Sequence, residues 1–308
     1  MRKKGILLTV SVALLGSLVL SACSDQGASS GKEGAAPASI NIGTQTYTEP
    51  KILAEMYKAL IEQNTKVKVK IVPDLAASPI VIQSMKNNDI QMATLYTGEI
   101  FNGYFDIQDT KDRKEVLKQA QEGFDKTFDF KWFEPYGFEN TYAFTVRKEL
   151  ADQHKLSTVS DLKELAQTMK LGVDTTWLER DNDGYRAFTK FYGFAFGERF
   201  PMEISLVYQA VADKKVDVVL AYTTDPGIKQ YNLQALKDDK QFFPPYDASP
   251  VVRKDILQQL PELNDVITSL AGKIDAEAMT DLNYEVDVNK RSPQEVAAQF
   301  LKEIGLLK

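Results

Sequence analysis

Strand-like and helix-like segments alternate in the first third of the chain, and this order limits the possible folds more than any other feature. Residues 40–44, 67–72 and 90–96 are predicted strands, the first two with alternating apolar residues. The segments between them carry apolar residues at helical spacing. A β-α-β-α-β order implies a parallel sheet with helices on its faces, and such sheets bind ligands at the carboxyl ends of their strands. Gln45 and Tyr96 both stand at those predicted ends.

A second α/β pattern begins near residue 158, so the sequence predicts a second lobe. Residues 170–173 and 216–222 are expected strands, and residues 183–192 and 206–212 are expected helices. Further helices are expected along the tail of the chain, after residue 250. No internal repeat of solenoid length interrupts this pattern.

Two extended stretches are expected to join the lobes. One is the continuous apolar run at residues 141–146, and the other contains Pro244 and Pro245, which hold an extended backbone. The predicted fold class is therefore α/β with two lobes and two crossings. The expected division places residues 40–143 and 247–308 in lobe 1 and residues 144–246 in lobe 2.

The N-terminus has the pattern of an export signal. A basic start is followed by an uncharged apolar run from residue 5 to residue 20, and small residues lead into Cys23. This is the lipobox pattern of bacterial lipoproteins, in which the cysteine thiol is acylated after cleavage. A membrane-spanning helix is the alternative, but the run is shorter than the ~20 residues that a span usually needs. We expect a signal peptide at 1–22, a lipid-anchored flexible linker at 23–39, and a location on the outer face of the cell membrane.

Composition excludes several classes of function. The formal net charge of −6 argues against nucleic acid as a partner, since nucleic-acid binding needs basic patches. Cys23 is the only cysteine and His154 the only histidine. With Cys23 used for lipid, no thiol remains for a disulfide, a nucleophile or a metal, and multi-histidine metal sites are excluded. His154 lies in a polar stretch and is interpreted as solvated. We therefore expect no metal, no cofactor and no catalytic residue.

Four tyrosines stand at expected strand ends or crossings: Tyr96, Tyr142, Tyr222 and Tyr246. A single tyrosine in such a place is more often core, with its hydroxyl in water. Four that converge on one cleft would present electron-rich ring faces to a cation too methylated to hydrogen-bond. Aromatic cages bind quaternary ammonium groups in this way, with each contact contributing ~0.5–2 kcal/mol when desolvated.

Other polar and aromatic residues receive structural interpretations. Asp217, Asp225 and Asp247 show no paired-acid spacing, and Asp225 precedes Pro-Gly as turn residues do. Trp177 is expected to pack inside a lobe rather than line the cleft.

Several stretches carry a resemblance to a known family: residues 96–98, 132–146, 171–174, 183–185, 220–225, 237–246 and 282–286. The chain resembles the osmoprotectant-binding proteins of ABC importers, which are glycine betaine/carnitine/choline-binding lipoproteins of Gram-positive bacteria. The similarity covers residues 40–308. Long, ordered matches of this kind are more specific than a lone short motif.

The resemblance implies a two-lobed periplasmic-binding-protein fold of type II that closes on its ligand by a hinge at the two crossings. It implies that Tyr96, Tyr142, Tyr222 and Tyr246 surround a trimethylammonium group and that Gln45 contacts the other end of the ligand. The implied partners are a quaternary ammonium compound and the transmembrane subunits of an ABC permease. A monomer is expected, because no extended apolar patch is legible in the sequence.

Glu99 departs from the family pattern, which often has Thr, or Asp in choline-selective members, after Tyr-Thr-Gly. If Glu99 faces the ligand, its carboxylate would disfavour the carboxylate of glycine betaine or carnitine and accept a hydrogen bond from the choline hydroxyl. The alternative is that Glu99 points to solvent or caps the residues that follow it.

Two other functions remain as alternatives. An extracytoplasmic enzyme acting on choline-bearing substrates is disfavoured by the lack of a free cysteine and of a second histidine. A sensor domain is disfavoured because the sequence shows no coiled coil or transmembrane helix to carry a signal. The preferred prediction is a binding subunit that delivers quaternary ammonium osmoprotectants to a permease and catalyses nothing itself.

Overall fold

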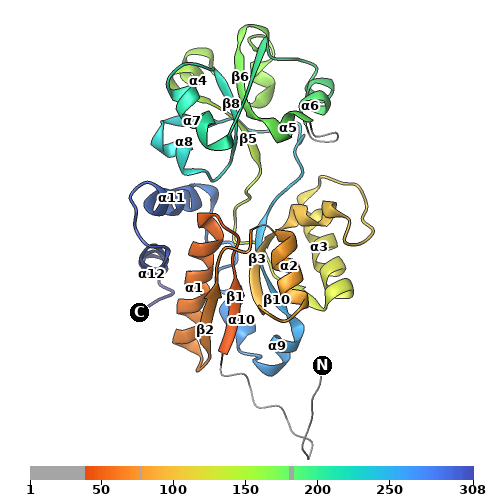
Figure 1. The fold of residues 1–308 in the computed structure, drawn as a ribbon, viewed down its shortest axis with the longest axis vertical. Helices are drawn as coiled ribbons and strands as arrows, with labels where there is room; N and C mark the ends of the chain where they lie inside the picture. Colours follow the sequence, from red (N-terminus) through yellow and green to blue (C-terminus); the bar gives the residue numbers. More distant parts are fainter. Residues whose placement is uncertain (1–38, 77, 180–183) are drawn as a thin grey trace, which may run out of the picture. The chain divides into compact units, whose positions relative to one another are not determined.

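The computed structural model describes residues 39–76, 78–179 and 184–308, all of which lie within the unit formed by residues 36–308 (Figure 1). The expected signal peptide, Cys23 and all but the last residue of the expected linker lie outside the described residues. Within the described part of the chain, no helix has the length and apolar character needed to cross a membrane.

The first five-stranded sheet has the order β2-β1-β3-β10-β4, and we call the elements packed on it lobe 1. Strand β1 runs parallel to β2 and β3, as the sequence predicts, whereas β10 runs antiparallel to β3 and β4. The chain therefore returns to lobe 1 near its end and adds an interior strand. The strands are β1 (Ser39–Gly43), β2 (Lys68–Val72), β3 (Met92–Tyr96), β4 (Phe130–Trp132) and β10 (Ala248–Arg253).

Helices cover both faces of this sheet (Figure 1). Met92 and Val252 face the core formed with α1, α10, α11 and α12, whereas Ala93 and Val251 face the core formed with α2 and α3. Neighbours along a strand point to opposite faces, so each strand fills two cores. The helices are α1 (Thr48–Asn64), α2 (Ser78–Lys86), η1 (Thr97–Asn102), α3 (Arg113–Phe128), α9 (Lys254–Gln259), α10 (Leu263–Thr268), α11 (Ala276–Asp287) and α12 (Pro293–Glu303).

The second sheet has the order β7-β6-β8-β5-β9, and its elements form lobe 2. Strand β6 is parallel to β7 and β8, while β5 is antiparallel to β8 and β9. The strands are β5 (Tyr142–Arg147), β6 (Lys170–Asp174), β7 (Glu198–Met202), β8 (Val218–Tyr222) and β9 (Leu233–Ala235). The helices are α4 (Lys148–His154), η2 (Val159–Leu162), η3 (Ala166–Thr168), α5 (Thr175–Glu179), α6 (Tyr185–Tyr192), α7 (Ile204–Ala212) and α8 (Pro226–Gln230).

The main core of lobe 2 is aromatic. Phe144 is fully buried, with its ring centroid 4.6 Å from that of Phe188 and 5.9 Å from that of Trp177. The prediction that Trp177 packs inside a lobe is confirmed, since the side chain is 0% exposed. His154 is exposed, as expected for a solvated residue.

Two segments connect the sheets, residues 133–141 and 236–247. They pair with each other through a bridge between Glu139 and Asp247, and the Asn140 N–H donates to the Tyr246 carbonyl at 3.0 Å. The apolar run at residues 141–146, which was expected to be a strand that crosses between the lobes, forms strand β5 inside the second sheet. A continuous apolar run suits a strand whose two faces are both covered. Because β5 begins at Tyr142, the first connection between the sheets lies before this residue. The expected boundaries of lobe 2, residues 144 and 246, stay a prediction.

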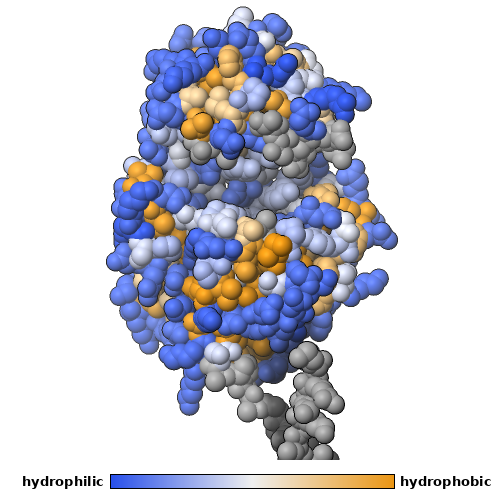
Figure 2. Space-filling view, in the orientation of Figure 1, coloured by the Kyte–Doolittle hydropathy of each residue, from blue (hydrophilic) through white to orange (hydrophobic). Residues whose placement is uncertain are grey.

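Large hydrophobic side chains that reach the surface of the described chain are Tyr47, Ile80, Phe191 and Leu206. Figure 2 shows hydrophobic residues in separate groups on the visible face, one of them around α2 in lobe 1. Separate groups of this kind are usual on proteins that act as single chains. The monomer stays a prediction.

Candidate functional site

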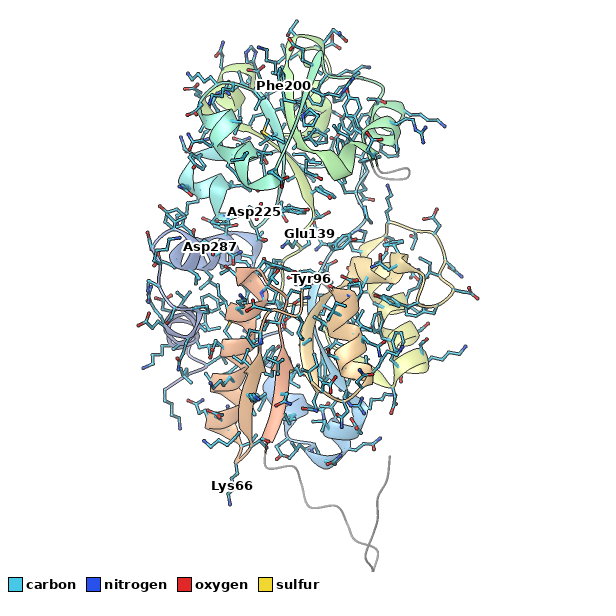
Figure 3. The ribbon with its side chains drawn as sticks, viewed as in Figure 1. Lys66, Tyr96, Glu139, Phe200, Asp225 and Asp287 are labelled. Carbon is cyan, nitrogen blue, oxygen red and sulfur yellow. The ribbon has the colours of Figure 1, made fainter. Side chains whose placement is uncertain are left out.

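A cavity of about 380 Å³ lies at the carboxyl ends of β3 and β8, and its wall takes residues from both lobes. Figure 3 labels Tyr96, which ends β3, and Asp225, which follows β8. Strand ends are where α/β sheets bind their ligands. The lining residues are Tyr47, Ser78, Tyr96, Glu99, Asn140, Tyr222, Asp225 and Tyr246.

Tyr96 and Tyr47 form one aromatic corner of the cavity. Their ring centroids are 6.4 Å apart with a tilt of 35°. Tyr96 is buried, and its hydroxyl donates to Glu49 Oε1 at 2.6 Å, which fixes the direction of the ring. Tyr47 is 41% exposed, so its ring stands at the opening. The carboxyl-end rule points to Tyr47 as well, because it follows β1, but the sequence interpretation missed it.

Tyr246 is held in the wall by the η1 loop. A Cβ atom on Gly98 would lie 2.2 Å from the Tyr246 ring, so only glycine leaves room for the ring at this place. Thr97 anchors the chain on both sides of Tyr246: its Oγ1 donates to the Pro245 carbonyl at 3.2 Å and accepts from the Asp247 N–H at 2.9 Å. The Tyr-Thr-Gly stretch thus contributes Tyr96 to the cavity wall and holds Tyr246 in place.

Tyr222 and Tyr142 are direct cross-strand partners in the β5–β8 ladder, and their rings stack with centroids 5.0 Å apart. Tyr222 lines the cavity. Tyr142 is instead in the wall of a neighbouring cavity of about 410 Å³, with its ring against that of Tyr222. The structure therefore brings Tyr96, Tyr222 and Tyr246 together and places Tyr142 behind Tyr222.

The neighbouring cavity has a different character. Arg113 binds both crossing segments there, through Asp247 and, at 3.7 Å, through Glu139. Lys111, Lys237 and Asp238 also contribute to its wall. A wall of mixed charges that includes the Arg113–Glu139 ion pair suits a structural junction better than a site for a methylated cation.

Gln45 lies beneath the cavity rather than in its wall. It is fully buried, and its Nε2 donates to Ser78 Oγ at 3.3 Å and to the Thr94 carbonyl at 3.2 Å. Among the described residues, its Oε1 has no hydrogen-bond partner. Ser78 lines the cavity, so Gln45 is linked to the cavity wall through its hydrogen bond to Ser78. The predicted contact of Gln45 with a ligand stays a prediction.

Glu99 faces the cavity and not the solvent. It is 7% exposed, and Asn102 Nδ2 donates to its Oε2 at 2.9 Å. Burial raises the pKa of the Glu99 carboxyl above its usual range, while hydrogen bonds from Ser78 and Asn102 oppose the rise. A cation in the cavity would also oppose it.

Asp225 lines the cavity from lobe 2, which corrects its interpretation as a turn residue only. Its side chain accepts a hydrogen bond from the Tyr208 hydroxyl. Burial raises the pKa of Asp225 to about 7, and the negative charge of Glu49 adds to the rise. The preceding sequence signal, Asp before Pro-Gly, describes the backbone and says nothing of where the carboxyl group points.

Comparisons with known proteins agree on one family. Residues 38–303 match the OpuAC family model, described as the substrate binding domain of an ABC-type glycine betaine transport system. The carnitine transport binding protein OpuCC of Listeria monocytogenes is 42% identical, over 98% of this chain and 97% of its own length. A glycine-betaine-binding protein of Pseudomonas aeruginosa is 32% identical, over 87% of this chain and 88% of its own.

A solved structure supports the same assignment. The crystal structure of a glycine betaine/carnitine/choline ABC transporter protein is 42% identical and superposes with a TM-score of 0.84, over 87% of this chain and all of that chain. The fold is thus that of the two-lobed periplasmic binding proteins. From the family model and these relatives together, the chain belongs to the OpuAC family of substrate-binding proteins of ABC-type glycine betaine transport systems.

Proposed function

We propose that this chain captures a quaternary ammonium osmoprotectant in the tyrosine-lined cavity and delivers it to the transmembrane subunits of an ABC permease. Its homologues are transport binding proteins, so the family is one of carriers and not of enzymes. We further propose that it acts outside the cytoplasm, tethered through lipid on Cys23.

One observation carries the choice of ligand: among the residues that the structure describes, the cavity wall combines four tyrosines with two carboxylates and contains no lysine, arginine or histidine. Tyrosine faces attract a cation that cannot hydrogen-bond, and Glu99 and Asp225 add negative charge. A ligand carboxylate would meet no cationic side chain from the described part of this wall. We therefore propose that choline binds more tightly than glycine betaine or carnitine, although the relatives are named for the latter two.

The test is titration calorimetry of the purified protein with choline, glycine betaine and carnitine. We expect choline to bind with the lowest Kd and trimethylammonium-free analogues such as ethanolamine to bind at least ~30-fold more weakly, since they lack the methylated cation that the rings prefer. The absence of measurable binding for all three quaternary compounds would refute the proposal.

Glu99 sets the preference between cation and zwitterion in this proposal. Replacing it by glutamine (Glu99→Gln) keeps its size and leaves an oxygen for Asn102, but removes the charge. We expect choline affinity to fall about tenfold, roughly 1.4 kcal/mol, and glycine betaine affinity to rise. Glu115→Gln, in the exposed first turn of α3, is the matched control and should change neither. Equal effects on both ligands would show that Glu99 only supports the wall.

Asp225 should make choline binding pH-dependent. A carboxyl with a pKa of about 7 is mostly protonated at pH 6 and mostly ionised at pH 8. A cation binds the ionised form better, so choline affinity should rise by about fivefold between pH 6 and pH 8 for a coupling near 1.4 kcal/mol, and binding near pH 7 should release protons. Calorimetry in buffers of different ionisation enthalpy measures both effects. Asp225→Asn should flatten the profile, whereas Asp152→Asn on exposed α4 should not.

A further inference from the structure

One buried acidic side chain lies beside the cavity without forming part of its wall. Glu49, in the first turn of α1, is 2% exposed. Among the described residues, none of the ion pairs involves it. A buried charge without a partner of opposite sign is costly, so its presence calls for a reason beyond packing.

Hydrogen-bond donors around Glu49 offset part of the cost of burying its charge. Four groups that can donate a hydrogen bond point at its two oxygens: Tyr96 Oη at 2.6 Å and Asn140 Nδ2 at 3.3 Å to Oε1, and Thr224 Oγ1 at 2.7 Å and Asn283 Nδ2 at 3.5 Å to Oε2. A carboxylate can accept from all four at once, whereas a protonated carboxyl would need an acceptor among them. Burial raises the pKa of Glu49, and these four hydrogen bonds oppose the rise.

The donors also place this charge at the meeting point of the two lobes. Tyr96 ends β3 in lobe 1, and Thr224 follows β8 in lobe 2. Asn283 of α11 donates in addition to the Thr224 carbonyl at 3.0 Å. The carboxyl group is therefore held in a fixed position by groups from both lobes.

We propose that Glu49 is the buried counter-charge of the site and acts through Tyr96 as a specificity-determining residue for permanently cationic ligands. The inference rests on the proposed function above. A tyrosine whose hydroxyl donates to a carboxylate carries more negative charge on its ring, which strengthens its attraction for a cation at the ring face. Weak screening in a buried setting adds a direct Coulomb attraction.

Choline and 3,3-dimethylbutan-1-ol have nearly the same shape but differ in charge, because a carbon atom replaces the cationic nitrogen of choline. Comparing their affinities therefore isolates the contribution of the ligand's charge. Calorimetry with both ligands gives the ratio of their affinities. For Glu49→Gln we expect this ratio to fall about tenfold, while the analogue binds within about twofold of its original affinity. The control Glu55→Gln removes a charge from the same helix, away from the cavity wall, and should leave the ratio unchanged. Glu49→Asp keeps the charge and should keep the ratio, even if both affinities fall.

A ratio that stays constant in Glu49→Gln, with both ligands weakened together, would overturn the proposal and assign Glu49 a purely structural role. If circular dichroism shows that Glu49→Gln does not fold, Glu49→Asp is the deciding variant. A fall in the ratio of choline to analogue affinity, despite the retained carboxylate, would overturn the proposal. An unchanged ratio would support it. Failure of the unaltered protein to bind choline would refute the proposed function instead, so the two failures are distinguishable.

Discussion

Replacing Tyr222 by alanine should weaken choline binding by about 30-fold or more. The ring lines the cavity from lobe 2, and loss of one desolvated cation–π contact costs about 2 kcal/mol. The change also leaves Tyr142 without its stacking partner. Titration calorimetry measures the effect, and Tyr231→Ala in the same lobe, outside the cavity wall, is the control. A loss below about threefold for Tyr222→Ala would contradict the aromatic cage.

The same measurement on Tyr142 tests the cage that the family resemblance implies. If Tyr142 contacts the bound cation, Tyr142→Ala should cost as much as Tyr222→Ala. If it only backs the Tyr222 ring, as the present structure has it, the cost should be smaller and Tyr142→Leu should recover most of it. Tyr47→Ala is then expected to exceed Tyr142→Ala, because Tyr47 lines the cavity.

Replacing Phe144 by alanine should destabilise the protein by about 3–5 kcal/mol, the usual cost of truncating a buried phenylalanine. Its ring is fully buried among Trp177, Phe188, Phe196 and Phe243, with centroids 4.6 to 6.1 Å away. At roughly 2–4 °C per kcal/mol, the Tm should fall by on the order of 10 °C. Calorimetric melting measures this.

Phe191→Ala is the matched control for this stability prediction. Phe191 belongs to the same lobe but is 47% exposed, so its removal leaves no cavity and should cost below about 1 kcal/mol. Equal shifts in Tm for the two variants would contradict the packing described for lobe 2.

The sequence predicts the elements that depend on local pattern. The parallel pairing of β1, β2 and β3 follows from the order of strands and intervening helices, and Tyr96 and Tyr222 are found because each ends a strand. The resemblance adds the two-lobed fold, which the structural comparison confirms.

Residues whose role depends on distant partners could not be predicted in this way. Asp225 and Glu49 are unremarkable in sequence, and only burial and contacts from the other lobe give them their character. The position of Tyr142 also depends on a distant partner: the β5–β8 register pairs it with Tyr222 and stacks the two rings. The register between two strands about 80 residues apart cannot be predicted from the sequence of either strand alone.

The placement of β10 between β3 and β4 has a consequence for how the chain acquires its structure. The first sheet lacks an interior strand until residues 248–253 are available, about 150 residues after β3. Every strand of the second sheet lies within residues 142–235, so lobe 2 is complete in one continuous stretch. Long-range pairings form slowly because loop closure must precede them. During synthesis lobe 2 can therefore fold first, whereas the first sheet cannot be completed until β10 has been synthesised.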